Sequence, residues 1–456
     1  MDIAVANGLE DAIHELARRG AVLRSIKNSY GLICLWNVET FESQLFAMFN
    51  TGVRPTKYAA LSHNWNVEEL EYEELSEMAA SERKSFAAAG TTSSIWSEIW
   101  KFFAKCKEWG IEWAWADFLC PSPIGELPEA GLSTFTIYER AAKTFVHLDT
   151  VVSEDGKSIR RSDTKRFRRA WFLQELLANS SDSTIFFNRG WQCLGNRVAL
   201  SQEISVVTEI APEYLHDFRQ ASVATELSWA HCLDAKSRRE RIYAMANILG
   251  VSMDSRNDES ELEAFCRLQA AIIDSLNDET IFAWHWIGRS QEIAEYFGYP
   301  LGLLAASIDW FFNCGDLRSA EGEKRFRVRR DSQGAVLGVE VELPSEWRRT
   351  AVKYFDVDLK CYRSQRRPLA DARLALRLWE DEEKDPLWPR KVYQRGEIMY
   401  DLPRRSYTRS LLKTIGTSGT AILFIPLNIS EADSFMRKLE LNDPKSEWYR
   451  RPEGIR

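Results

Sequence analysis

Closely spaced cysteine pairs are missing from the chain, although it has eight cysteines in 456 residues. Structural zinc sites are commonly built from such pairs, so the sequence predicts no metal site. Scattered single cysteines are typical of reduced thiols in a cytoplasmic protein. Residues 1–20 carry acidic side chains where a secretory leader needs basic ones, which agrees with a cytoplasmic location.

An excess of basic residues, a long apolar run and a glycine-rich phosphate loop are also missing. The net charge is −8, whereas general nucleic-acid binding needs a basic face, so we expect no nucleic-acid partner. The most apolar run of the later chain, residues 299–312, contains Asp309 and is too short to cross a membrane, so we expect no membrane contact. Without a glycine-rich loop, hydride transfer by a bound dinucleotide is not indicated.

Tryptophan, by contrast, is abundant. The chain has 17 tryptophans, 45% hydrophobic residues and 28% charged residues. This is the composition of a globular protein that buries large aromatic cores. A chain of this length is expected to form two or three domains.

The stretch 167–177, FRRAWFLQELL, carries the most informative pattern of the chain. Its apolar residues recur at helical spacing, which predicts one amphipathic helix. Trp171 and Glu175 are four residues apart and therefore share a face of that helix. A carboxylate beside an indole commonly lines a pocket for a sugar or a flat base, and it also commonly closes the rim of an ordinary core.

Four short apolar runs alternate with helical patterns and predict strands. These runs are residues 58–65, 111–120, 144–148 and 183–188. Strands separated by helices form a mainly parallel sheet with helices on its faces, so the expected fold class is α/β.

Polar and aromatic side chains stand where two of these strands end. Ser62, His63 and Trp65 end the first strand, and Asp117 lies near the end of the second. The carboxyl ends of parallel strands meet at one edge of a sheet, where open α/β folds bind ligands, so we expect a site there. The ordinary roles of these residues are loop hydrogen bonding for His63, capping of the next turn for Asp117, and core packing for Trp65 and Trp171.

A charged loop, residues 153–166, precedes the predicted helix. It contributes to a group of seven basic residues between Lys157 and Arg169. Such a group is usually a solvated loop, and the alternative is a rim that faces a phosphate.

Changes in sequence pattern divide the chain into four parts. Residues 1–56 are predicted to form a helical lead-in, residues 57–210 the α/β domain, residues 211–320 a helical region, and residues 321–456 a β-rich C-terminal domain. No internal repeat or low-complexity tract interrupts this division.

Several motifs resemble, in the same order, those of the fungal heterokaryon-incompatibility (HET) domain. YAALSHNW resembles its first signature, WAWADFLC its second and RAWFLQELL its third, and the likeness extends over roughly residues 57–315. The chain departs from the family at Asn66, where glycine is usual, and at Ala170, which precedes Trp171 where Arg-Gly-Trp is usual.

The HET domain is in turn similar to the TIR domain, which implies a TIR-like, flavodoxin-like parallel sheet flanked by helices. WFLQEL fits the TIR pattern Trp-Cys-x-x-Glu-Leu except at Phe172. In TIR enzymes the glutamate serves hydrolysis of NAD+ at the nicotinamide–ribose bond, so the resemblance implies that Glu175 is catalytic. NAD+ would be the substrate, and no cofactor is expected. The expected substrate-binding residues are Ser62, His63, Trp65, Asp117 and Trp171.

The function implied by the resemblance is that of a cell-death effector in non-self recognition, with possible self-association through the HET domain and an unknown activating protein. One alternative is a signalling module without catalysis, in which Glu175 is a structural or surface acid. Another is a thiol hydrolase that uses Cys120 with His63, since both stand at predicted strand ends.

Overall fold

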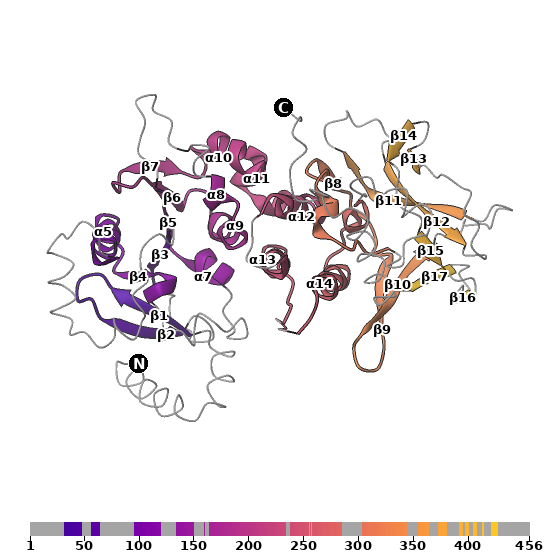
Figure 1. Ribbon diagram of the computed structural model, residues 1–456, viewed down its shortest axis with the longest axis horizontal. Coiled ribbons are helices and arrows are strands. Elements are labelled where there is room, and N and C mark those ends of the chain that lie inside the picture. The colour runs from indigo at the N-terminus through magenta and orange to yellow at the C-terminus, as the bar shows by residue number, and fades with distance from the viewer. Residues whose placement is uncertain are drawn as a thin grey trace, which may run out of the picture. The chain divides into compact units, whose positions relative to one another are not determined.

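The computed structural model describes residues 32–47, 56–63, 95–119, 134–149, 159, 164–233, 238–254, 256, 258–284, 303–343, 354–363, 373–380, 392–394, 397–400, 405–407, 413–414 and 421–426. The chain divides into two units, Met1–Phe218 and Arg219–Arg456, and each is described by itself (Figure 1). No helix in the described ranges is long and apolar enough to span a lipid bilayer.

Unit 1 is built on a seven-stranded sheet, counted over its described residues, with the spatial order β2-β1-β4-β3-β5-β6-β7. The strands are β1 (Leu32–Asn37), β2 (Ser43–Ala47), β3 (Tyr58–Ser62), β4 (Trp113–Trp115), β5 (Lys143–His147), β6 (Thr184–Phe187) and β7 (Cys193–Asn196). The four central strands β4, β3, β5 and β6 are parallel, and antiparallel strands flank them on both sides. The predicted α/β class with a parallel central sheet is confirmed.

The order of the four parallel strands indicates a candidate ligand-binding edge. In space they follow the sequence second, first, third, fourth, which is the order of flavodoxin-like sheets. The order reverses between β3 and β5, and open α/β sheets bind ligands outside the carboxyl ends of the strands at such a point. Ser62 ends β3 there and pairs with Val146 of β5.

The N-terminal strands correct one prediction. Residues 32–37 and 43–47 form β1 and β2 of this sheet, so the expected helical lead-in over residues 1–56 is wrong for this stretch. The physical reason is burial, because β1 pairs with β4 and the Trp36 side chain is enclosed there. The Trp36 indole Nε1 donates to the carbonyl of Leu119 at 2.7 Å. Residues 1–31 lie outside the described part of the chain.

Helix α5 (Ile95–Glu108) packs on one face of the sheet (Figure 1). Its buried side chains recur at helical spacing and belong to one core with the apolar residues of β3 to β6. They are Ile99, Phe102, Phe103 and Cys106. Gly110 lets the helix end, since its φ of +66° is a left-handed conformation that a glycine adopts without a steric penalty.

Helices α7 (Thr134–Arg140), α8 (Thr164–Phe167) and α9 (Ala170–Leu177) lie on the other face of the sheet (Figure 1). Two helices replace the single helix predicted over residues 167–177. The break falls at Arg169, whose backbone is extended with φ −72° and ψ 131°.

Helix α9 contributes buried apolar side chains to the core on this face, and helix α7 is hydrogen-bonded to β3. The buried apolar side chains of α9 are Ala170, Phe172, Leu173, Leu176 and Leu177. From α7, the Tyr138 hydroxyl donates to the carbonyl of Leu61 in β3 at 2.9 Å. The hydrogen bond from Tyr138 places α7 close to the carboxyl end of β3.

Arg197, which follows β7, fixes the carboxyl end of α9. Its guanidinium donates to the carbonyl of Leu215 through Nε at 2.7 Å, to that of Asn179 through Nη2 at 3.0 Å, and to that of Leu176 through Nη1. The last carbonyls of a helix lack partners within the helix, and a cation there also suits the helix dipole. Leu215 belongs to α11 (Pro212–His216), which follows α10 (Ser201–Thr208), so Arg197 joins α9 to α11.

Unit 2 begins with helices α12 (Val223–Trp229), α13 (Arg238–Ile248) and α14 (Glu261–Ser275). Helix α14 starts at a capping box, in which Ser260 Oγ accepts from the Glu263 backbone N–H at 3.2 Å and the Glu263 carboxylate accepts from the Ser260 backbone N–H at 2.8 Å. Short 3-10 helices complete the helical elements of the described chain. They are η1 (Asp117–Leu119) and η3 (Phe218–Gln220), followed in unit 2 by η4 (Ala230–Cys232), η5 (Glu279–Phe282) and η6 (Ile308–Phe311).

Strands fill the later part of unit 2. They are β8 (Leu317–Ser319), β9 (Phe326–Arg330), β10 (Val336–Leu343), β11 (Tyr354–Arg363), β12 (Arg373–Glu380), β13 (Val392–Gln394), β14 (Glu397–Tyr400), β15 (Arg405–Tyr407), β16 (Lys413–Thr414) and β17 (Ala421–Pro426). Over the described residues they form the sheets β16-β17-β10-β9 and β15-β12-β11-β8 and the hairpin β13-β14. These strands share one compact unit with α12 to α14, and a separate β-rich domain from residue 321 stays a prediction.

Replacing Arg197 with methionine is expected to lower the free energy of unfolding by about 3 kcal/mol, because buried carbonyls lose their donor. Urea denaturation followed by tryptophan fluorescence measures this change. The matched control is Arg189→Met at an exposed position, where a change within about 0.5 kcal/mol is expected. Equal effects of the two substitutions would contradict the role assigned to Arg197.

Candidate functional site

Polar side chains gather at the carboxyl end of β3, beside the point where the strand order reverses. Successive side chains of a strand point to opposite faces of the sheet. Leu61 accordingly belongs to the core under α5, whereas Ser62 points to the face that carries α8 and α9. The strand therefore delivers a hydroxyl beneath these two helices.

Ser62 joins a carboxylate to a guanidinium. Its hydroxyl donates to Oε2 of Glu175 in α9 and accepts from Nη2 of Arg166 in α8 at 2.6 Å. Ser62 is 1% exposed and Arg166 is 5% exposed, while Glu175 is of intermediate exposure. The contact between Ser62 and Glu175 links residues 113 positions apart, and it places the predicted catalytic carboxylate at the predicted sheet edge.

Burial and charge act in opposite directions on this group. Burial raises the pKa of Glu175, whereas the Arg166 charge and the hydrogen bond from Ser62 lower it. Burial likewise lowers the pKa of Arg166, and the Glu175 carboxylate raises it. The two charges thus stabilise each other across the serine hydroxyl. The Arg166 guanidinium also lies 4.8 Å from the centre of the Phe172 ring, a cation–π contact.

His63 and Asp117 form a second pair at the same edge. His63 Nδ1 lies 3.8 Å from Asp117 Oδ1, and the imidazole meets the Phe118 ring edge-on at 4.8 Å between centroids. Burial lowers the pKa of His63 to about 3, and the charges of Arg166 and other cations add to this effect, so the imidazole is neutral at pH 7. Asp117 is also the first residue of η1, and its Oδ1 accepts from the Phe118 backbone N–H at 3.0 Å.

A third group lies at the end of β5, next to β3. The His147 ring stacks on Trp191 with 4.6 Å between centroids and 15° between planes, and its Nε2 lies 3.9 Å from Oε2 of Glu98. The Trp191 indole Nε1 donates to the same carboxylate at 2.7 Å, and Lys101 Nζ donates to Oε1 at 2.9 Å. Burial lowers the pKa of His147, against the opposing charge of Glu98.

Trp171 is not joined to these groups by a hydrogen bond. It lies on α9 with 36% of its surface exposed, and among the described residues no hydrogen bond or ring contact links it to Ser62, Arg166 or Glu175. Trp65 lies outside the described residues, as does Cys120, so the pairing of Cys120 with His63 stays untested.

Arg166 and His147 were not among the predicted site residues. Arg166 lies within the basic group between Lys157 and Arg169, for which a phosphate-facing rim was one interpretation. His147 ends the third predicted strand, and its position at the carboxyl edge was the available signal.

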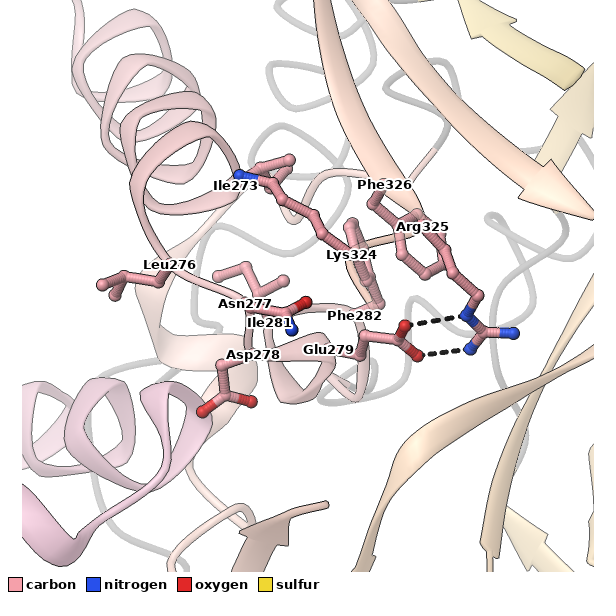
Figure 2. A pocket seen from close by; sticks show the side chains of 10 residues that line it. All are labelled: Ile273, Leu276, Asn277, Asp278, Glu279, Ile281, Phe282, Lys324, Arg325 and Phe326. Carbon is pink, nitrogen blue, oxygen red and sulfur yellow. Dashed lines mark hydrogen bonds and ion pairs between the residues drawn. The ribbon is translucent and has the colours of Figure 1, made fainter. Parts of the chain in front are cut away.

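A small hollow in unit 2 does not resemble a ligand site (Figure 2). Arg325 lines it and donates to Glu279 at 2.9 and 2.5 Å, and the Lys360 backbone N–H donates to the same carboxylate at 2.8 Å (Figure 2 draws the Arg325 pair). Arg325 and Glu279 are therefore paired with each other, and Lys324 donates to the carbonyl of Asp274 at 2.5 Å. Its volume of about 10 Å³ is that of roughly one water molecule. Within the described ranges, no group of three potential metal ligands occurs.

The chain was compared with known protein families, curated proteins and solved structures. No protein-family model, no curated protein and no solved structure matches it.

Replacing His63 with glutamine is expected to make stability less sensitive to acid. Unfolded His63 is protonated at pH 5, whereas the folded residue, with a pKa of about 3, is neutral. Unfolding therefore takes up a proton, and stability falls as pH decreases from about 6.5 towards 3. The loss of unfolding free energy between pH 7 and pH 5 should shrink by about 2 kcal/mol in His63→Gln.

Urea denaturation at the two pH values measures this difference. The control is His216→Gln, since His216 is exposed, and it should keep the pH dependence of the unmodified chain. An unchanged pH dependence in His63→Gln would show that the folded imidazole is not held neutral.

Proposed function

We propose that unit 1 is a TIR-like hydrolase of the HET type, which cleaves NAD+ at the nicotinamide–ribose bond with Glu175 as the catalytic carboxylate. The observation that carries the proposal is the position of Glu175, which Ser62 holds at the reversal point of a flavodoxin-like sheet. The motif resemblance supplies the substrate and reaction class.

The proposed reaction needs a negative charge at a fixed place. When the bond between C1′ and the nicotinamide nitrogen breaks, its electron pair neutralises the cationic ring and positive charge develops on the ribose. A fixed carboxylate stabilises that charge, and the leaving group needs no strong acid. Water then adds to C1′ and releases a proton.

The surroundings of Glu175 favour this role. Burial has the largest effect and raises the pKa of Glu175, while the Arg166 charge and the hydrogen bond from Ser62 limit this rise and so favour the ionised form that the reaction needs. His63 is neutral at pH 7, so it can hydrogen-bond to a ribose hydroxyl or to water without placing another cation beside the cationic nicotinamide. Asp117 lies beside it and offers an acceptor.

The wider proposal is a cytoplasmic cell-death effector of non-self recognition, activated by an unknown protein, with a β-rich C-terminal domain. Single, scattered cysteines support the cytoplasmic location. The order of the HET-like motifs supports the biological role.

A signalling module without catalysis is the second candidate. The observation that favours it is Trp171, a large apolar side chain that is 36% exposed on α9. Exposed aromatic side chains are common in protein–protein interfaces. In this case Trp171→Ala would abolish self-association in analytical ultracentrifugation, whereas Glu175→Gln would leave it intact.

Glu175→Gln is expected to reduce nicotinamide release from NAD+ by at least about 100-fold, because the carboxylate charge is lost with little change in shape. The purified full-length chain is incubated with NAD+ at high protein concentration, and nicotinamide is measured by chromatography. Glu108→Gln, which removes an exposed carboxylate on α5, is the control and should keep full activity.

Two results would contradict this function. Nicotinamide release that persists in folded Glu175→Gln would remove the catalytic role of Glu175. No release from the unmodified chain, even when concentrated, would favour the signalling module.

A further inference from the structure

Arg166 has more hydrogen-bond donors than the described residues satisfy. A guanidinium carries five N–H groups on three nitrogens. Nη2 donates to Ser62 at 2.6 Å, while Nε and Nη1 find no acceptor among the residues that the structure describes. The side chain is only 5% exposed, so water does not readily replace the missing acceptors. Buried charged donors without partners are costly, and they point to an acceptor that a ligand brings.

The nearest groups do not fill this role. The Tyr138 hydroxyl donates to the carbonyl of Leu61 and accepts no hydrogen bond from Arg166 among the described contacts, and the Phe172 ring covers one face of the guanidinium without accepting an in-plane hydrogen bond. Arg166 is not hydrogen-bonded to Glu175 directly, and Ser62 links the two in the hydrogen bonds described. The unused donors therefore remain available on a cation held in place by its packing.

The spacing between Arg166 and Glu175 restricts the ligand. Ser62 Oγ bonds to both, so the bonded atoms of guanidinium and carboxylate are separated by at most two hydrogen-bond lengths, about 5 Å. A ribose ring separates its 2′ and 3′ hydroxyls from a 5′-phosphate by a similar span. Glu175 suits the hydroxyls as an acceptor, and Arg166 suits the phosphate, because guanidinium groups bind phosphate oxygens through charge-assisted hydrogen bonds.

We propose that Arg166 binds the 5′-phosphate of the ribose whose hydroxyls face Glu175, so that the site selects sugar phosphates over unphosphorylated sugars. The identity of the sugar depends on the proposed function, whereas the phosphate contact depends on Arg166 alone. Arg166 is then a specificity-determining residue and also positions Ser62. Since Nε and Nη1 are covered in the unbound chain, binding requires a neighbouring side chain to move.

Isothermal titration calorimetry on the full-length chain tests this contact, with ADP-ribose, ribose 5-phosphate, ribose and inorganic phosphate as probes. The unmodified chain should bind ribose 5-phosphate at least about 10-fold more tightly than ribose or inorganic phosphate. Weak binding of inorganic phosphate would distinguish a sugar-phosphate site from a site for free phosphate.

Arg166→Gln should weaken ADP-ribose binding by about 10- to 100-fold and abolish the preference for ribose 5-phosphate over ribose. Arg166→Lys keeps the charge but loses the planar donors, so an intermediate loss is expected. Lys165→Gln removes an exposed charge from the neighbouring position on α8 and should bind ADP-ribose like the unmodified chain. Circular dichroism shows whether each variant folds.

The proposal is overturned if the unmodified chain binds ribose 5-phosphate no better than ribose, if no probe binds, or if folded Arg166→Gln binds ADP-ribose normally. If Arg166→Gln does not fold, the comparison of ribose 5-phosphate with ribose in the unmodified chain still decides. Nicotinamide release is a separate measurement. Its absence, with ribose 5-phosphate binding retained through Arg166, would remove the hydrolase and leave the sugar-phosphate site.

Discussion

The candidate site depends on one hydroxyl that stands between two opposite charges. Ser62 accepts a hydrogen bond from Arg166 and donates one to Glu175, and it does so at the end of a buried strand. Burying either charge alone costs free energy, and each charge lowers the cost of burying the other. The serine side chain is short, so it also sets the distance between carboxylate and guanidinium. The fold contributes the strand, and α8 and α9 contribute the two charges.

The helix that carries Glu175 is held at both ends by buried arginines of different elements. Arg166 lies near its amino end and bonds to Ser62, while Arg197 binds the carbonyls of Leu176 and Asn179 at its carboxyl end. A short helix has few internal hydrogen bonds and depends on such tertiary contacts. Under the proposed function these contacts would keep the carboxylate in one place, since catalytic groups tolerate little displacement.

The sheet was predictable from the sequence because buried parallel strands leave short apolar runs between helical patterns. The rule that such strands end at one edge predicted the position of Ser62, whereas the position of Glu175 in the same site was implied only by the motif resemblance. The sequence does not single out Arg166, because the seven basic residues near it share one chemistry and only tertiary packing decides which is buried. The orientation of Trp171 depended likewise on how α9 rolls against the sheet, and β1 and β2 belonged to the sheet through a hairpin that the sequence pattern did not reveal.

Successive side chains of β3 point to opposite faces of the sheet, so the register of this strand decides which chemical group each face receives. Ser62 faces the charged pair under α8 and α9, while the next residue, His63, packs against Phe118 of the opposite core. A shift of the strand by one residue would exchange the two faces. The imidazole would then lie between Arg166 and Glu175, and the Ser62 hydroxyl would be buried in an aromatic core without a hydrogen-bond partner. Insertions and deletions within this strand are therefore far more harmful than most substitutions, since they would change the side chains on both faces of the sheet at once.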